Sequence, residues 1–276
     1  MRTKRPIVWM ILLCFACAPQ AMAGMLIGAS FDGTIYDVDP ATGLATNPRE
    51  SGLDTIVELA FSPDGDLFAI DGLSVYRITP GGSPPELIGP DILVGGWVGI
   101  SFDPMTSVLY GSVDFLGISL LYTLDTETGR PTFIGEPGSS AGKIAFDPQG
   151  RLYLLDGSPA LREIDKLTGH GLNIVSISLD LGRAGMTFAE DGTLFIVDGD
   201  TAAATDTLYT LDPTTGILTS IGHTGLDNGL LGLAYIPEPS SLALLLVGVV
   251  VSVRAVWASN VFPWDSNHRK DEGHVK

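Results

Sequence analysis

Pairs of carboxylates separated by one residue are the part of this sequence most suited to metal chemistry. The pairs are Asp37 with Asp39, Asp64 with Asp66, and Asp198 with Asp200. A further carboxylate, Asp206, follows the last pair. Calcium binds hard oxygen ligands of this kind. However, none of these pairs begins a twelve-residue loop that ends in Glu, which is a common calcium-binding pattern. We therefore expect most of these carboxylates to cap turns and no cofactor to be bound, with Asp198, Asp200 and Asp206 as the candidates for a calcium site.

A second set of Asp residues stands at the same place in repeated segments. Asp125, Asp165 and Asp212 each precede a tight turn that ends in Thr-Gly. In this position an Asp side chain accepts hydrogen bonds from the backbone N–H groups of its own turn. We expect these carboxylates to be structural.

Other catalytic motifs are missing from the sequence. The four His residues have no ligand spacing, and there is no Gly-x-Ser-x-Gly elbow and no phosphate-binding Gly loop. The only cysteines are Cys14 and Cys17, so the body of the chain has no thiolate zinc site. The net charge of -17 excludes the basic surface that nucleic acid requires. We expect no catalytic residue.

Two interleaved repeats determine how these residues are positioned. One is a short strand followed by a Thr-Gly or Gly-Gly turn, and its clearest copy is Leu208–Gly216. The other is a strand that ends in an aromatic residue. The aromatic residues recur every 41 to 47 positions, at Phe61, Phe102, Phe146, Phe188 and Tyr235. A period of about 40–50 residues is typical of the four-stranded blades of a β-propeller.

The two ends of the repeated region complete each other. The chain begins with the second and third strands of a blade, Leu26–Ser30 and Ile35–Asp39, and the region ends with a lone first strand, Leu231–Ile236. Pairing of that last strand with the N-terminal blade closes a ring and leaves no unpaired inner edge. We predict an all-β fold, a five-bladed β-propeller at 24–236, with an N-terminal signal helix and a C-terminal hydrophobic helix. An open array or a β-sandwich is the alternative.

The innermost strands contain one candidate for chemistry at the propeller axis. The residues three positions before each aromatic residue are Glu58, Gly99, Lys143, Gly185 and Gly232. A glycosidase needs two carboxylates roughly 5–10 Å apart, and this set contains one. We expect Glu58 and Lys143, which occupy equivalent positions in non-adjacent blades, to form a structural ion pair near the channel mouth or to face solvent.

The connections between blades lie on one face of a propeller, and loops on a rigid scaffold are the usual binding surface. They span 50–56, 90–97, 136–142, 180–184 and 223–230. The candidates for ligand binding there are Trp97, Arg183, His223, Asp227 and Asn228. Trp97 either stacks on a sugar ring or fills the channel mouth as part of the core.

The first 23 residues have the features of a secretory signal peptide. A basic start is followed by an apolar run from Ile7 to Ala16 and by the small-x-small site Ala21-Met22-Ala23. We predict cleavage before Gly24 and export, with lipoprotein processing at Cys17 as the alternative.

The chain changes character again after Ile236. Pro237-Glu238-Pro239 precedes an apolar run from Leu242 to Val253, which ends at Arg254. This run is shorter than the 20 or so residues of a comfortable membrane span. It predicts a temporary membrane segment with a cytoplasmic C-terminus. The polar tail at 255–276 is expected to be disordered.

These C-terminal residues resemble the PEP-CTERM sorting signal of bacterial exported proteins. The resemblance covers 237–254 and rests on Pro237, Glu238 and Pro239, the apolar run and Arg254. It implies recognition by an exosortase, a membrane cysteine peptidase that removes the tail on the way to the cell surface or exopolysaccharide matrix. The chain departs from the pattern because it has a single Arg and continues for twenty-two residues beyond it. The repeats resemble the NHL and YVTN class of propellers in general pattern.

The sequence therefore predicts an exported propeller that acts as a non-enzymatic interaction module at the cell surface or in the extracellular matrix. The expected partners are an exosortase during processing, the membrane before it, and then polysaccharide or surface proteins. The alternative is a calcium-dependent hydrolase or lactonase with its site at the channel mouth. The small residues on the inner strands argue against that alternative, because a metal there requires several axial side chains.

Overall fold

The computed structural model describes residues 24–89, 95–140, 142–157, 159–178, 181, 184–199, 206–227 and 229–236. The chain divides into two units, Met1–Pro237 and Glu238–Lys276, and the described residues all belong to the first. The predicted signal helix and C-terminal hydrophobic helix lie outside the described residues. Within those residues, no helix has the length and apolar character needed to cross a membrane.

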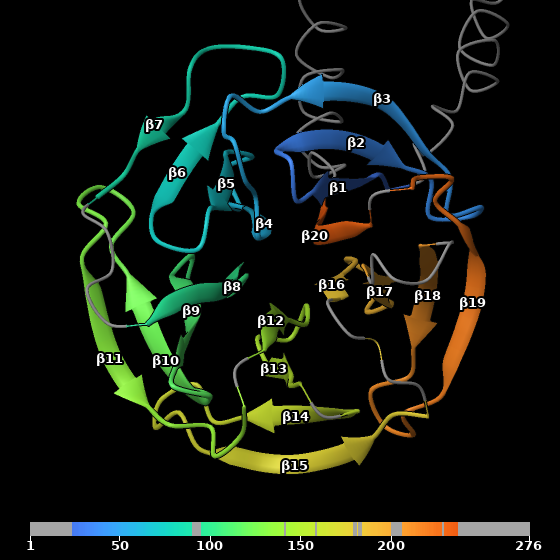
Figure 1. Cartoon of the computed structure of the whole chain (residues 1–276). Coiled ribbons are helices and arrows are strands. Elements are labelled where there is room, and N and C mark those ends of the chain that lie inside the picture. Colours follow the sequence, from blue (N-terminus) through green and yellow to red (C-terminus); the bar gives the residue numbers. More distant parts are fainter. Residues whose placement is uncertain are drawn as a thin grey trace, which may run out of the picture. The chain divides into compact units, whose positions relative to one another are not determined.

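The described residues form five antiparallel sheets of four strands, which Figure 1 shows arranged as a ring. We number these blades in chain order and give their strands from the axis outward. Blade 1 contains β20 (Leu230–Tyr235), β1 (Leu26–Ser30), β2 (Thr34–Val38) and β3 (Ala45–Glu50). Blade 2 contains β4 (Glu58–Phe61), β5 (Leu67–Ile70), β6 (Val75–Ile78) and β7 (Glu86–Leu87).

The other three blades follow the same order without interruption. Blade 3 contains β8 (Gly96–Phe102), β9 (Leu109–Phe115), β10 (Ile118–Leu124) and β11 (Pro131–Gly135). Blade 4 contains β12 (Lys143–Phe146), β13 (Leu152–Leu155), β14 (Ala160–Ile164) and β15 (Gly171–Ser176). Blade 5 contains β16 (Ala184–Phe188), β17 (Leu194–Asp198), β18 (Thr207–Leu211) and β19 (Leu218–His223).

The closure predicted from the two ends of the repeated region is confirmed. Strand β20 pairs antiparallel with β1, and the register places Tyr235 opposite Leu26 and Leu233 opposite Gly28. The innermost strands β20, β4, β8, β12 and β16 each contact the innermost strands of the two neighbouring blades. The ring therefore has no unpaired inner edge, which removes the usual weak point of an open sheet.

The hydrophobic core lies between the blades, and the repeated aromatic residues form part of it. Three of the five, Phe102, Phe146 and Phe188, pack against an aromatic residue on the second strand of the preceding blade. The ring centroids are 5.2 Å apart for Phe68 and Phe102, 5.0 Å for Tyr110 and Phe146, and 5.3 Å for Tyr153 and Phe188. Such contacts add to the burial of apolar area at each boundary between blades. The aromatic period in the sequence is thus the period of the interface between blades.

The innermost strands approach one another so closely that glycine is required at three places. A Cβ atom on Gly99 would lie 2.8 Å from Ile144 N, one on Gly185 would lie 3.0 Å from Leu233 N, and one on Gly232 would lie 3.1 Å from Glu58 Cα. Each glycine therefore permits the backbone of the next blade to pack against it. The small face predicted for the first strands results from this contact.

The turns that end in Thr-Gly are capped as predicted. The Asp125 carboxylate accepts a hydrogen bond from Thr128 N at 2.8 Å, Asp165 accepts one from Leu167 N at 2.9 Å, and Asp212 accepts one from Thr214 N at 2.8 Å. The hydroxyl and backbone of Thr214 stabilise the charged form and lower the pKa of Asp212 to about 2. These carboxylates are structural, as the sequence indicated.

Candidate functional site

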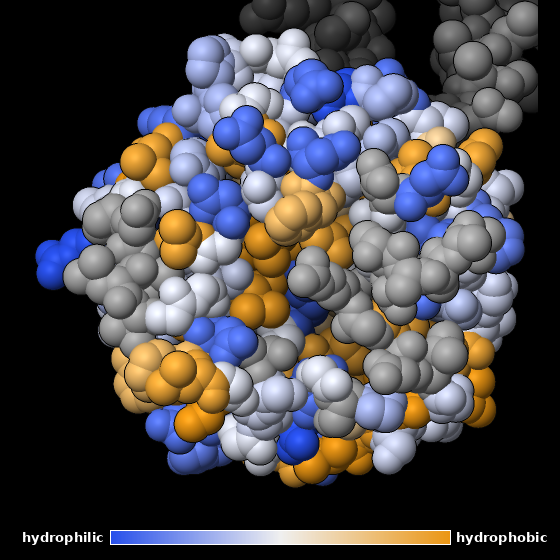
Figure 2. Space-filling view, in the orientation of Figure 1, coloured by the Kyte–Doolittle hydropathy of each residue, from blue (hydrophilic) through white to orange (hydrophobic). Residues whose placement is uncertain are grey.

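Antiparallel strands divide the loops of this propeller between two faces. The connections between blades share one face with the turns that join the second and third strands of each blade. We call this the connection face. Figure 2 shows it, with hydrophobic patches set among hydrophilic ones and a hollow near the centre. The turns between first and second and between third and fourth strands lie on the opposite face.

An ion pair crosses the propeller axis just below the connection face. Glu58 and Lys143 are the first residues of β4 and β12. Lys143 Nζ lies 3.3 Å from Glu58 Oε2 and donates a hydrogen bond to the Val57 carbonyl oxygen at 2.5 Å. The ion pair predicted between these two non-adjacent blades is confirmed. Gly99 is the equivalent residue of the blade between them, and because it has no side chain it leaves room for the ion pair.

The Glu58 carboxylate also joins its blade to the closing strand. Its Oε1 accepts hydrogen bonds from Leu59 N at 3.1 Å and from Leu233 N at 2.9 Å. Glu58 is 1% exposed, and burial raises its pKa to about 7, although Lys143 and the two N–H donors act in the opposite direction. The other axial positions are three glycines and Lys143, so no second carboxylate is available there for glycoside chemistry.

A second buried carboxylate lies beside the first residue of the closing strand. Asp206 is 3% exposed. Its Oδ2 accepts hydrogen bonds from Leu230 N at 2.8 Å and from Thr224 Oγ1 at 3.2 Å, and its buried Oδ1 accepts none from the described residues. Burial, with a smaller contribution from the charge of Asp198, raises the pKa of Asp206 to about 7. Asp198 and Asp206 of the predicted calcium group are thus near each other.

The other paired carboxylates, which the sequence analysis assigned to turns, make structural contacts, and in the described part of the chain the calcium candidates are not joined by a third ligand. Among the residues that the structure describes, no group of three or more His, Cys, Asp or Glu is placed to hold a metal ion. Asp200 lies outside the described residues. Asp37 pairs with Arg49 at 2.5 Å, Asp39 accepts a hydrogen bond from Ala41 N at 2.8 Å, and Asp66 lies 3.6 Å from Arg77. These contacts are structural.

Trp97 belongs to the core, which is one of the two alternatives that the sequence left open. It is 4% exposed and packs edge-on against Tyr122, with ring centroids 6.0 Å apart. The reason is that β8 begins at Gly96, which places Trp97 inside the sheet. A Cβ atom on Gly111 would lie 2.4 Å from the Trp97 ring, so glycine makes room for the indole.

Two of the other predicted loop residues, His223 and Asp227, lie in or near the connection from blade 5 to blade 1. His223 is the last residue of β19 and is exposed, and its Nδ1 lies 2.9 Å from Thr207 Oγ1. Asp227 is exposed. Arg183 and Asn228 lie outside the described residues. Within the part of the chain that the structure describes, His223 and Asp227 are surface groups, and no catalytic set surrounds them.

The sequence interpretation missed the apolar tips of the turns between second and third strands. Phe31, Leu73 and Leu116 are 51%, 53% and 89% exposed on the connection face. Their signal in the sequence is a large apolar residue beside Asp or Gly in a turn, where polar residues are the rule.

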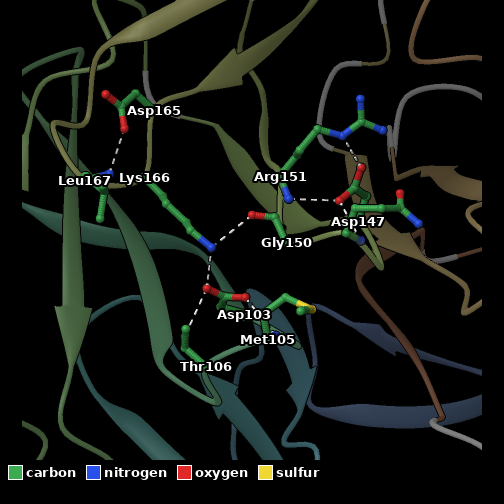
Figure 3. A network of polar contacts seen from close by, with 10 residues as sticks. Asp103, Met105, Thr106, Asp147, Gly150, Arg151, Asp165, Lys166 and Leu167 are labelled. Carbon is green, nitrogen blue, oxygen red and sulfur yellow. Dashed lines mark hydrogen bonds and ion pairs between the residues drawn. The ribbon is translucent and has the colours of Figure 1, made fainter.

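The opposite face contains polar contacts that join neighbouring blades, as Figure 3 shows. Lys166, in the β14–β15 turn, lies 2.6 Å from Asp103 in the β8–β9 turn and donates to the Gly150 carbonyl oxygen at 3.0 Å. Burial disfavours the charged form of Asp103, but the hydrogen bonds from Lys166 and from its own turn hold its pKa below the ordinary value. This network links blade 3 to blade 4 and has the character of a structural contact.

No protein-family model and no curated protein matches the chain. Solved structures resemble it, among them a chain of the nidogen/laminin complex, with a TM-score of 0.54, 13% identity and coverage of 78% of this chain and 99% of that one. TolB from Acinetobacter baumannii gives a TM-score of 0.51 at 15% identity, covering 83% and 70%. A structural genomics protein of unknown function from Bacteroides thetaiotaomicron gives 0.50 at 17% identity, covering 78% and 65%.

At these identities the similarity concerns the fold alone. It supports the β-propeller fold that the repeats predicted, and the five closed blades are given by the strand pairing of this chain.

Proposed function

We propose that the protein is an exported β-propeller that acts as a non-enzymatic interaction module at the cell surface or in the extracellular matrix. The observation that carries this proposal is the bonding of Glu58, the one carboxylate among the five equivalent axial positions. It accepts hydrogen bonds from Leu59 and Leu233 and faces Lys143. A group with these partners holds three blades together, whereas glycoside hydrolysis needs a second carboxylate on the other side of the bond to be cleaved.

Export is supported by the two ends of the chain. The signal-peptide pattern at 1–23 and the PEP-CTERM-like residues at 237–254 fit a protein that crosses the membrane, is held briefly by its apolar segment and is processed by an exosortase. The connection face of the propeller then presents turns on a rigid scaffold to polysaccharide or to a surface protein.

Intact-mass measurement of the protein recovered from the cell surface and the medium tests the export and processing. The expected masses correspond to cleavage after Ala23 and near Pro239. Recovery of the full-length mass from the cytoplasm alone would contradict the proposal. A lipid-sized mass addition at Cys17 would replace the signal-peptide interpretation by lipoprotein processing, which also leads to export.

Binding to extracted matrix material and turnover of model lactones and glycosides test the molecular role. We expect binding that saturates and no turnover above that of the Glu58→Gln variant. Turnover that this variant loses would make Glu58 catalytic and overturn the proposal.

A calcium-dependent hydrolase or lactonase is the second candidate, and one observation favours it. The buried Oδ1 of Asp206 has no hydrogen-bond partner, and a cation is one way to satisfy such an atom. A calcium titration followed by thermal melting decides the matter, because a ligand that binds only the folded state raises Tm. A rise in Tm that Asp206→Asn abolishes would support the metal site.

A further inference from the structure

Three turns of the connection face form one continuous surface with the loops between them. The first turn, 30–34 in blade 1, contacts the connection 51–57 that leads into blade 2. Ile56 N donates a hydrogen bond to the Phe31 carbonyl oxygen at 3.4 Å. Gly33 lies so close to the Leu53 carbonyl that a Cβ atom would overlap it. The first turn is therefore fixed to the start of blade 2.

The contacts continue from blade 2 to blade 3. A Cβ atom on Gly72, in the second turn, would touch the Val57 side chain at 3.8 Å, and the Gly72 carbonyl oxygen accepts a hydrogen bond from Trp97 N at 2.8 Å. Gly95 packs against the carbonyl of Asp114, where the third turn begins. We call this region the three-turn surface. It consists of the turns 30–34, 71–74 and 114–118 and the connecting residues 51–57 and 95–96.

Each turn of this surface exposes large apolar side chains. Phe31 and Leu73 are each about half exposed, and Leu116 is 89% exposed beside Phe115 and Ile118. Figure 2 shows hydrophobic patches on this face over the turns of blades 2 and 3. Exposed apolar groups gathered on one face mark an interaction site more often than isolated ones do.

The backbone at Leu116 indicates that folding alone does not account for this residue. Leu116 has a φ of 55° and is followed by Gly117 with a φ of 83°. A two-residue hairpin turn with positive φ at both positions favours Asn-Gly, and a leucine there is locally unfavourable. Because its side chain packs against nothing that would compensate, the leucine fits a contact with another molecule.

The charge of the three-turn surface has one sign. Asp32, Asp54, Asp71 and Asp114 lie in its turns and loops and are exposed or half-exposed. The same residue ranges contain no Lys, Arg or His. A surface that alternates apolar tips with carboxylates is complementary to a partner that alternates apolar side chains with cations.

We propose that the three-turn surface binds a basic amphipathic peptide segment of a partner protein. The apolar side chains of the segment contact Phe31, Leu73 and Leu116, and its Lys or Arg residues face the four carboxylates. This inference rests on the proposed function, for which it names the class of partner. An acidic polysaccharide would be repelled by the same carboxylates, and a neutral one offers no charge to them.

The test uses the full chain and a fluorescein-labelled synthetic peptide of alternating Lys and Leu, followed by fluorescence anisotropy. Leu73→Asn combined with Leu116→Asn should weaken binding about tenfold. The matched control is Leu167→Asn, because Leu167 is 80% exposed in a turn of the opposite face, and it should leave binding unchanged. Asp54→Lys should weaken binding, whereas Asp64→Lys, an exposed position on the opposite face, changes the net charge equally and should not.

Asn suits the positive φ at position 116, so the variants are expected to fold, and an unchanged or higher Tm verifies this. Equal losses in the opposite-face controls would show general attraction to an acidic protein and overturn the inference. Binding of a neutral polysaccharide but not of the peptide would overturn the partner class and leave the interaction module in place. Binding of neither, together with turnover of a lactone or glycoside, would remove the proposed function as well.

Discussion

The main-chain N–H of Leu233 donates a hydrogen bond to the carboxylate of Glu58 at 2.9 Å, and this bond joins two segments 175 residues apart in the chain. Leu233 lies in the strand that closes the ring and Glu58 in the first strand of blade 2. Three residues earlier in the closing strand, Leu230 donates its N–H to Asp206 of blade 5 at 2.8 Å. The strand that closes the propeller is thus held at its first residue and near its middle by buried carboxylates from its two neighbours.

Removal of one side chain of the ion pair between Glu58 and Lys143 should lower the free energy of unfolding. Lys143→Met leaves the buried Glu58 without its cation, and removal of one partner of a buried pair typically destabilises a protein by about 3–5 kcal/mol. The double variant Glu58→Gly with Lys143→Gly places in both blades the residue found in the other three, and it should lose less stability than the sum of the single variants Glu58→Gly and Lys143→Gly. Urea unfolding of the parent protein, the two single glycine variants and the double variant measures the coupling free energy between the two side chains. Strictly additive losses would show that the two side chains act independently.

The folded state should become more stable as the pH falls from about 7 towards about 4.5. Burial raises the pKa of Glu58 from 4.5 and that of Asp206 from 3.8, each to about 7. In this window the folded protein binds more protons than the unfolded chain, so the free energy of unfolding decreases as the pH rises. The charge of Lys143, which faces Glu58, lowers the pKa of Glu58, and the charge of Asp198 raises the pKa of Asp206, but burial is the largest cause of both shifts.

Below about pH 4 the trend should reverse. The lowered pKa values of Asp125, Asp165 and Asp212 mean that their turn caps stabilise the fold only while they are charged. Thermal melting at a series of pH values measures both trends. Asp206→Asn should reduce the slope between pH 4 and 7, and an unchanged slope in that variant would show that Asp206 titrates normally.

The three axial glycines should not tolerate a methyl group. In Gly99→Ala the added Cβ would lie 2.8 Å from Ile144 N, so the inner strands must move apart, at an expected cost of about 1–3 kcal/mol. Gly157→Ala is the control, because Gly157 is exposed and its Cβ would meet only the Ser140 side chain, at 3.3 Å, and no backbone of another strand. Chemical denaturation compares the two. Equal stability of Gly99→Ala and the parent protein would mean that the axis is wider than described.

The ion pair between blades 3 and 4 should contribute more to the free energy of unfolding than an exposed ion pair does. Lys166→Met removes the cation from Asp103, whose side chain is fully buried, and should cost about 2–3 kcal/mol. Arg77→Met removes pairs with Asp66 and Glu86 in which the carboxylate side chains are 58% and 63% exposed, and should cost less than about 1 kcal/mol. Urea midpoints of the two variants provide the comparison, and the reverse order would contradict it.

Leu116→Asn should raise stability while it weakens binding of the basic peptide. Leu116 has a φ of 55°. A leucine in this left-handed region is destabilising by about 1 kcal/mol relative to a residue that suits the region. Thermal melting and anisotropy on the same sample test both effects. A loss of stability in this variant would show that the leucine is needed for folding, which would remove one support of the inference.

Much of the fold follows from the sequence because its signals are local and repeated. The aromatic residue at the end of each first strand, the capped turns and the unmatched strands at 26–30 and 231–236 together predicted the blades and the closure. Trp97 shows where such reasoning ends. Its position near a connection left a surface role and a core role equally open, and only the structure shows that β8 begins at Gly96 and that Trp97 is buried.

By itself, the sequence determined the number of sheets, the strand that completes the ring and the glycines along the axis, since each depends on a period repeated along the chain. Only the tertiary structure decided that Lys143 reaches Glu58 past Gly99, that Asp206 meets Leu230, and that Phe31, Leu73 and Leu116 share one continuous surface. These relationships join different blades. Their distances depend on how the sheets pack around the axis, and no interval along the chain specifies that packing.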